Sequence, residues 1–99
     1  MTHPNILRLA DLLNEMAALC ATDGNGWASL LSKWQNALRQ SDAWGLHELL
    51  KSFGGMGSLN DVVLQSVEGD ARADNARFQK LREDAWQLAN KLKHTAIGV

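Results

Sequence analysis

The residues best suited to metal chemistry are three histidines and one cysteine. None of His3, His47 and His94 lies three or four residues from another histidine or from Cys20. Ligands on one helix need that spacing to reach the same ion from one face. The sequence therefore predicts no metal site, and we expect no cofactor. His47 falls at the border of an apolar stripe, where a half-buried histidine is the ordinary expectation.

Nucleophilic catalysis would need a serine, threonine or cysteine held beside a base. The sequence has no Gly-x-Ser-x-Gly elbow of the kind that exposes a hydrolase serine. Cys20 lies among apolar residues of a predicted helix, whereas a reactive thiolate needs an electropositive and partly exposed site. We expect an inert core thiol and a protein that is not an enzyme. One cysteine cannot form an internal disulfide, which fits a reducing cytoplasm.

The most unusual local sequence is the glycine-rich run FGGMGSLND at residues 53–61. A glycine-rich loop that leads into a helix can cradle a phosphate. This run lacks the Gly-Lys-Ser/Thr ending of a P-loop, and Asp61 would place a negative charge where the phosphate should lie. We favour a structural interpretation, in which Gly54 and Gly55 end one helix and Ser58 caps the next.

Trp44 is the residue best placed to contact a partner. At about 100° per residue it points away from the apolar stripe of its predicted helix, towards the face that carries Glu48 and Lys51. An exposed tryptophan is a good interface anchor, because aromatic residues are enriched at binding hot spots. The alternative, that Trp44 packs under the first or the last helix, stays open at this point.

Hydrophobic periodicity predicts the helices that must position these residues. Apolar residues recur at three-and-four spacing over residues 4–21, 26–40 and 70–94, which predicts a helix over each range. Another helix should follow the second range, from a cap at Ser41 or Asp42 to Gly54 and Gly55. A short fourth helix at residues 58–67 follows from the capping pattern at Ser58. Its β-branched valines also permit a strand, although a lone strand would have no partner. The prediction is one all-α domain over residues 1–99, a compact bundle of four to five helices.

Charge and hydropathy narrow the classes of partner. Ten lysines and arginines against eleven aspartates and glutamates give a net charge of -1, so no positive field is available to collect phosphates, and we expect no nucleic-acid partner. Charged residues also interrupt the leucine-rich start of the chain well before about 20 apolar residues accumulate. We therefore expect no membrane span and no signal peptide.

The glycine-rich run is similar to the signature of a family of small bacterial helical domains of unassigned function. The segment between Trp27 and Phe53 resembles the rest of that family's pattern. The resemblance implies a helical fold and a bacterial origin, and it brings no catalytic residue. Asn60 and Asp61 are the positions in the run that we would mutate first.

The function we expect is partner binding by a bacterial immunity or inhibitor protein that neutralises a toxin by direct contact. The expected surface has Trp44 as anchor, Glu48 and Asp61 as acidic contacts, Met56 as an adaptable apolar contact, and Asn60 beside them. Such an acidic surface would suit a toxin with a basic cleft. The alternative is a homo-oligomeric structural or adaptor protein, such as a homodimer, which would use the surplus leucines of the first helix: Leu7, Leu12 and Leu19. A small enzyme is the least supported class.

Overall fold

Four α-helices make up most of the described chain. The computed structural model describes residues 4–24, 26–40, 42–53, 62–65 and 70–93. The helices are α1 (Pro4–Asp23), α2 (Trp27–Arg39), α3 (Ala43–Lys51) and α4 (Ala71–Leu92). The predicted all-α bundle is confirmed. Among these described residues, no helix is long and apolar enough to cross a membrane.

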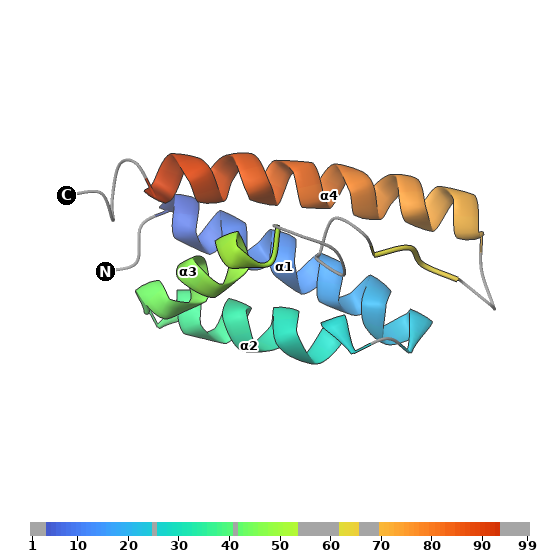
Figure 1. The fold of residues 1–99 in the computed structure, drawn as a ribbon, viewed down its shortest axis with the longest axis horizontal. Helices are drawn as coiled ribbons and strands as arrows, with labels where there is room; N and C mark the ends of the chain where they lie inside the picture. The colour runs from blue at the N-terminus through green and yellow to red at the C-terminus, as the bar shows by residue number, and fades with distance from the viewer. Residues whose placement is uncertain (1–3, 25, 41, 54–61, 66–69, 94–99) are drawn as a thin grey trace.

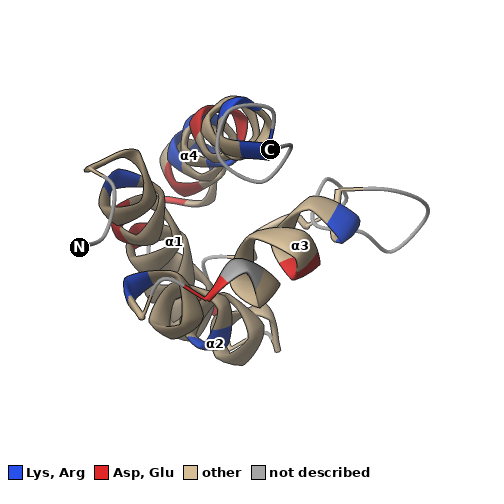
Figure 2. Cartoon of the chain, turned by 90° about the vertical axis from the view of Figure 1, so that its left-hand side faces the viewer, with Lys and Arg blue, Asp and Glu red and all other residues tan. Residues whose placement is uncertain are grey.

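The long helix α1 is the centre of the bundle. It packs along α2 on one side and along α4 on the other, while α3 folds back against α2 and makes few contacts with α4 (Figures 1 and 2). Figure 2 looks along the bundle and shows α3 and α4 on the same side of α1, held apart from each other. This arrangement leaves both α3 and α4 with a face that no other described helix covers.

The ends of α1 follow the local sequence. Pro4 stands in the first turn, where its missing N–H would have had no helical partner. Gly24 ends the helix with φ of 76°, a left-handed conformation that costs glycine little, and its N–H donates to the carbonyl oxygen of Ala21 at 3.1 Å. The helix therefore runs two residues further than the predicted range of 4–21.

One hydrophobic core joins all four helices. From α1 it takes the predicted stripe, in which Cys20 is fully buried, and from α4 it takes Phe78, which is also inaccessible to solvent. The other buried hydrophobic side chains among the described residues are Leu9, Ala10, Leu12, Leu13, Met16, Ala17, Leu31, Trp34, Leu38, Leu46, Leu49, Leu64, Leu81, Ala85, Ala89 and Leu92. The buried position of Cys20 confirms that it is a core thiol.

The surplus leucines of the first helix do not form an exposed surface. Leu12 is buried and Leu19 packs half-buried against the core, so of the three only Leu7 stays exposed. The reason is that α1 has two long neighbours, α2 and α4, and needs a wider apolar face than the one stripe that periodicity predicts. The dimer surface expected on α1 is therefore not supported.

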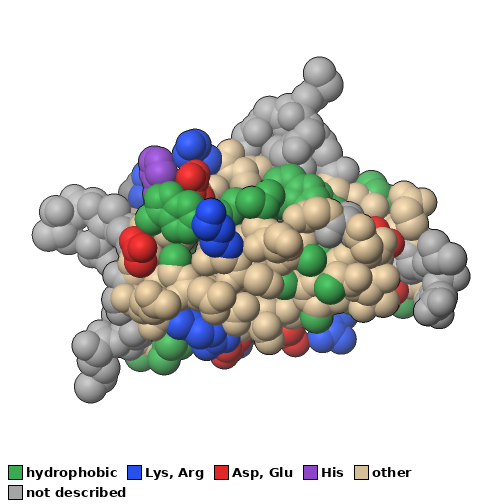
Figure 3. All heavy atoms as spheres, turned by 90° about the horizontal axis from the view of Figure 1, so that it is seen from below, with side chains coloured by type: hydrophobic (Ala, Val, Ile, Leu, Met, Phe, Trp, Pro, Cys, Tyr) green, Lys and Arg blue, Asp and Glu red, His purple; other side chains and the backbone are tan. Residues whose placement is uncertain are grey.

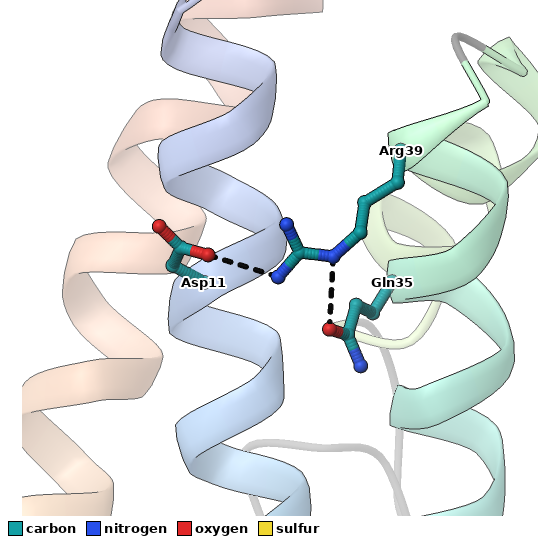
Figure 4. A network of polar contacts seen from close by, with 3 residues as sticks. All are labelled: Asp11, Gln35 and Arg39. Atoms are coloured by element: carbon teal, nitrogen blue, oxygen red, sulfur yellow. Dashed lines mark hydrogen bonds and ion pairs between the residues drawn. The ribbon is translucent and has the colours of Figure 1, made fainter.

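Two ion pairs tie α1 to its neighbours. The Arg39 guanidinium of α2 donates to the Asp11 carboxylate at 2.9 Å and to the side-chain oxygen of Gln35 at 3.1 Å (Figure 4). On the other side of α1, the Arg77 guanidinium of α4 lies 3.1 Å from the Glu15 carboxylate. All four charged side chains are well exposed to solvent, so each pair adds little stability and mainly favours one register of the helices.

The predicted fourth helix is wrong over residues 62–65, which have no helical structure. The Asn75 side chain replaces the missing helical bonds: its Oδ1 accepts from the Leu64 N–H at 2.7 Å and its Nδ2 donates to the Leu64 carbonyl at 2.8 Å. The Gln65 N–H donates to Asp23 of α1. These bonds hold Leu64 in the core. Gly54, Gly55 and Ser58 lie outside the described residues, and α3 ends earlier than predicted, at Lys51.

Candidate protein-binding face

The first turn of α3 fixes the position of Trp44. Asp42 caps the helix, and its carboxylate accepts from the Trp44 N–H at 3.0 Å. This satisfies one of the N–H groups that a helix start leaves without a partner. The backbone of Trp44 is therefore fixed by a hydrogen bond to Asp42, the residue just before the helix. Asp42, one of the two predicted caps, is confirmed in that role.

Gly45, the next residue, brings α3 unusually close to α2. A Cβ atom at Gly45 would lie 2.8 Å from the backbone carbonyl oxygen of Trp34 and 3.0 Å from the Cβ of Ala37. Real Cβ atoms do not approach a carbonyl oxygen that closely. Only glycine therefore allows this contact without a shift of one helix, and the contact sets the depth at which Trp44 lies on α2.

Trp44 is partly exposed on the outer side of this helix pair. Its exposed fraction is 38%, which answers the alternative left open by the sequence: neither the first nor the last helix covers it fully. The ammonium group of Lys33, on α2, lies 5.2 Å from the centre of the indole ring. At that distance the ring attracts the cation, and the contact holds two side chains from different helices together.

Charged groups continue this surface along α3. Glu48 stands one turn after Trp44, and its carboxylate lies 3.3 Å from the ammonium of Lys51. His47 is exposed, so the expectation of a half-buried histidine is wrong. The described charges near the indole are therefore mixed, with Lys33 and Lys51 against Glu48. Asp61, the other predicted acidic contact, lies outside the described residues.

Apolar surface continues along α2 from Lys33. Leu30 lies one turn before Lys33 on the same side of the helix, and 42% of it is exposed. Figure 3 looks at the side formed by α2 and α3 and shows hydrophobic side chains in a band, with charged side chains and a histidine at one end. We call the surface made by Leu30, Lys33, Trp44 and Glu48 the Trp44 face.

The structure brings together two of the five predicted contact residues. Trp44 and Glu48 share one face of α3. Met56, Asn60 and Asp61 lie outside the described residues, so their place relative to Trp44 stays a prediction. No group of three potential metal ligands occurs among the residues that the structure does describe.

Sequence reasoning missed three residues that matter here. Lys33 and Leu30 belong to a different helix from Trp44, and periodicity within one helix cannot pair residues across two. Gly45 did carry a local signal, since a glycine inside a predicted helix is unfavourable by about 1 kcal/mol relative to alanine and calls for a packing reason.

Comparison with known families now adds a finding about the Trp44 face. A family model described as Domain of unknown function (DUF6966) matches residues 21–72, just over half of the chain. The chain belongs to this family. The DUF6966 match spans α2 and α3 completely, together with residues 62–65, and omits nearly all of α1 and α4. The whole Trp44 face thus lies inside the family's region, as do Met56, Asn60 and Asp61.

Membership confirms the expected resemblance to a family of unassigned function and assigns no activity to the chain. No match was found among the curated proteins or among the solved structures.

Proposed function

We propose that this chain is a protein-binding domain that acts through the Trp44 face, and that it serves as a bacterial immunity or inhibitor protein that neutralises a toxin by direct binding. The observation that carries the binding proposal is the exposed Trp44 indole on a rigid helix pair. The toxin is the more specific part of the proposal, and it rests on analogy with small helical inhibitors rather than on site chemistry.

Preorganisation supports a binding role for Trp44. The Asp42 cap fixes the first turn of α3, Gly45 fixes its distance from α2, and Lys33 restrains the ring. A side chain already held in one place loses little conformational entropy when a partner covers it. Such a tryptophan, surrounded by polar groups that exclude water on binding, has the properties of an interface hot spot.

The mixed charge around the indole suits a partner surface that is itself mixed. Lys33 forms no ion pair with any described residue, so its ammonium group is available to a carboxylate of the partner. Glu48 can pair with a basic group there in exchange for Lys51. Complementary charges of this kind select the right partner and speed encounter more than they raise affinity.

The direct test uses the protein that the neighbouring gene encodes, because an inhibitor and its toxin are normally encoded side by side. Co-expression should protect cells from that neighbour's toxicity, and the two purified proteins should form a complex. Trp44→Ala should lose protection, whereas Trp86→Ala, which removes another exposed tryptophan on a different helix, should retain it.

Two results would contradict this proposal. If the two purified proteins do not associate, the toxin role is wrong. If they associate and Trp44→Ala protects as well as the unaltered chain, the Trp44 face is not the binding surface.

A further inference from the structure

The charged groups around the Trp44 indole differ in how fully they are engaged within the chain. The Asp42 carboxylate accepts the hydrogen bond from the Trp44 N–H at 3.0 Å, at the start of α3, where the helix dipole favours a negative charge. Glu48 pairs with Lys51 at 3.3 Å, and the glutamate side chain is 28% exposed against 64% for the lysine. Both carboxylates are therefore compensated, and the ion pair presents mainly its ammonium group to solvent.

Lys33 is the charge on the Trp44 face that is not compensated. It is exposed, and its ammonium group forms no ion pair or hydrogen bond with any residue that the structure describes. The ring centre of Trp44 lies 5.2 Å away. The ring attracts the cation but does not neutralise it. An ammonium group has three N–H donors and no acceptor, so the group that completes this contact is an acceptor, and the strongest acceptor is an anion.

The surroundings of Lys33 favour a protein carboxylate over a phosphate. Leu30 stands one turn before it on α2 with 42% of the residue exposed, and the Trp44 residue beside it is 38% exposed. Phosphate-rich ligands such as nucleic acids are held by several lysines and arginines, and this chain has a net charge of -1. One ammonium group beside two exposed apolar side chains instead matches an acidic side chain that has apolar neighbours of its own.

We infer that the partner contacts the Trp44 face through an aspartate or a glutamate, which pairs with Lys33 while apolar side chains next to that acidic residue cover Leu30 and the indole. The inference rests on the proposed binding function and names the chemistry of the partner's contacting segment. It differs from the toxin with a basic cleft that the sequence suggested. A basic group could reach Glu48 only in exchange for Lys51, whereas a carboxylate at Lys33 breaks no existing ion pair.

Lys33 is then a specificity-determining residue. When the partner covers this surface, water leaves the ammonium group, and an opposite charge interacts with it more strongly than it would in bulk water. A like charge at the same place is repelled, and a neutral side chain leaves the ammonium group without its anion. Trp44 supplies contact area to any partner, and Lys33 selects the acidic one.

The test uses three blocked pentapeptides that carry glutamate, glutamine or lysine between two leucines and are otherwise identical. Nuclear magnetic resonance follows the indole N–H of Trp44, which is assigned as the signal that Trp44→Phe removes. The glutamate peptide should shift this signal with a dissociation constant on the order of 1 mM. The glutamine peptide should bind at least about fivefold more weakly, and the lysine peptide more weakly still.

Lys33→Gln should remove the preference for glutamate over glutamine. Lys80→Gln is the matched control and should keep the preference, because Lys80 is an exposed lysine on α4, which α1 separates from α2 (Figure 1). The inference is overturned if the unaltered chain binds the lysine peptide as tightly as the glutamate peptide, or if none of the three peptides shifts the Trp44 signal. It is also overturned if Lys33→Gln still prefers glutamate.

The protein that the neighbouring gene encodes separates this inference from the proposed function. Lys33→Glu should weaken binding to that protein by at least about tenfold, and Lys33→Gln by less. If that protein does not bind the unaltered chain but the glutamate peptide is preferred, the toxin role is wrong and the acidic specificity stands. If it binds the unaltered chain and Lys33→Glu equally well, the partner's contacting residue is not acidic, and this inference alone fails.

Discussion

Gly45 lies so close to Trp34 that the carbonyl oxygen of Trp34 would be 2.8 Å from a Cβ at Gly45. This contact joins α3 to α2 through backbone, and backbone cannot move aside as a flexible side chain can. The position of Trp44 on the surface therefore depends on a residue that has no side chain.

Replacement of Gly45 by serine should destabilise the protein by about 1–3 kcal/mol, because the added Cβ forces the two helices apart. Gly26→Ser is the matched control. Nothing lies within 4 Å of a Cβ at Gly26, and serine is a good residue at a helix start, so stability should change by no more than about 0.5 kcal/mol. Urea unfolding measures both. Equal losses would mean that the close approach of α3 to α2 is unimportant.

Removal of the Asn75 side chain should release the segment that carries Leu64. Asn75→Ala leaves the Leu64 N–H and C=O without partners in a partly buried site, and we expect a loss of about 2 kcal/mol. Asn90→Ala removes a similar amide on the same helix that bonds only to its own helix, at an exposed position. Its effect should stay within about 0.5 kcal/mol in the same urea titration. A similar cost for both variants would contradict the bridging role of Asn75.

Asp70 should stabilise the start of α4 through its acceptor oxygen. Its carboxylate accepts from the N–H groups of Arg72 and Ala73, at 3.0 and 3.2 Å. Asp70→Ala should therefore cost about 1 kcal/mol in thermal or urea unfolding, whereas Asp70→Asn, which keeps an acceptor, should cost only a few tenths. If asparagine proves as costly as alanine, the negative charge rather than the hydrogen bonds stabilises this end of α4.

Local sequence patterns predicted the helices of this fold but not the contacts between segments that are far apart in the sequence. Periodicity predicts which side of α1 and α4 is buried because a helix has a fixed turn per residue. Periodicity within one helix cannot show that α1 packs against two long helices. Leu12 was therefore expected on the surface, although it is buried. The capping pattern at Ser58 predicted a helix over residues 62–65, but Asn75, eleven residues after Leu64, provides bonds that no local pattern contains. Tertiary contacts thus decide this segment.

The candidate site also has a part that the sequence predicted and a part that it did not. Trp44 and Glu48 were predicted together because both belong to one helix and lie one turn apart. Lys33 was not predicted, because its contact with Trp44 crosses from α2 to α3. The mixed charge of the surface follows from that missed contact and from the pairing of Glu48 with Lys51.

The measurement that tests the central claim most directly is calorimetric titration of Trp44→Ala with the protein that the neighbouring gene encodes, which is the proposed toxin. The account predicts that affinity falls by about 30-fold or more, equivalent to about 2 kcal/mol, while the free energy of unfolding changes little. Lys33→Gln should weaken binding in the same direction by a smaller factor. The account is contradicted if Trp44→Ala binds as tightly as the unaltered chain, or if it unfolds the domain while the folded fraction binds with unchanged affinity.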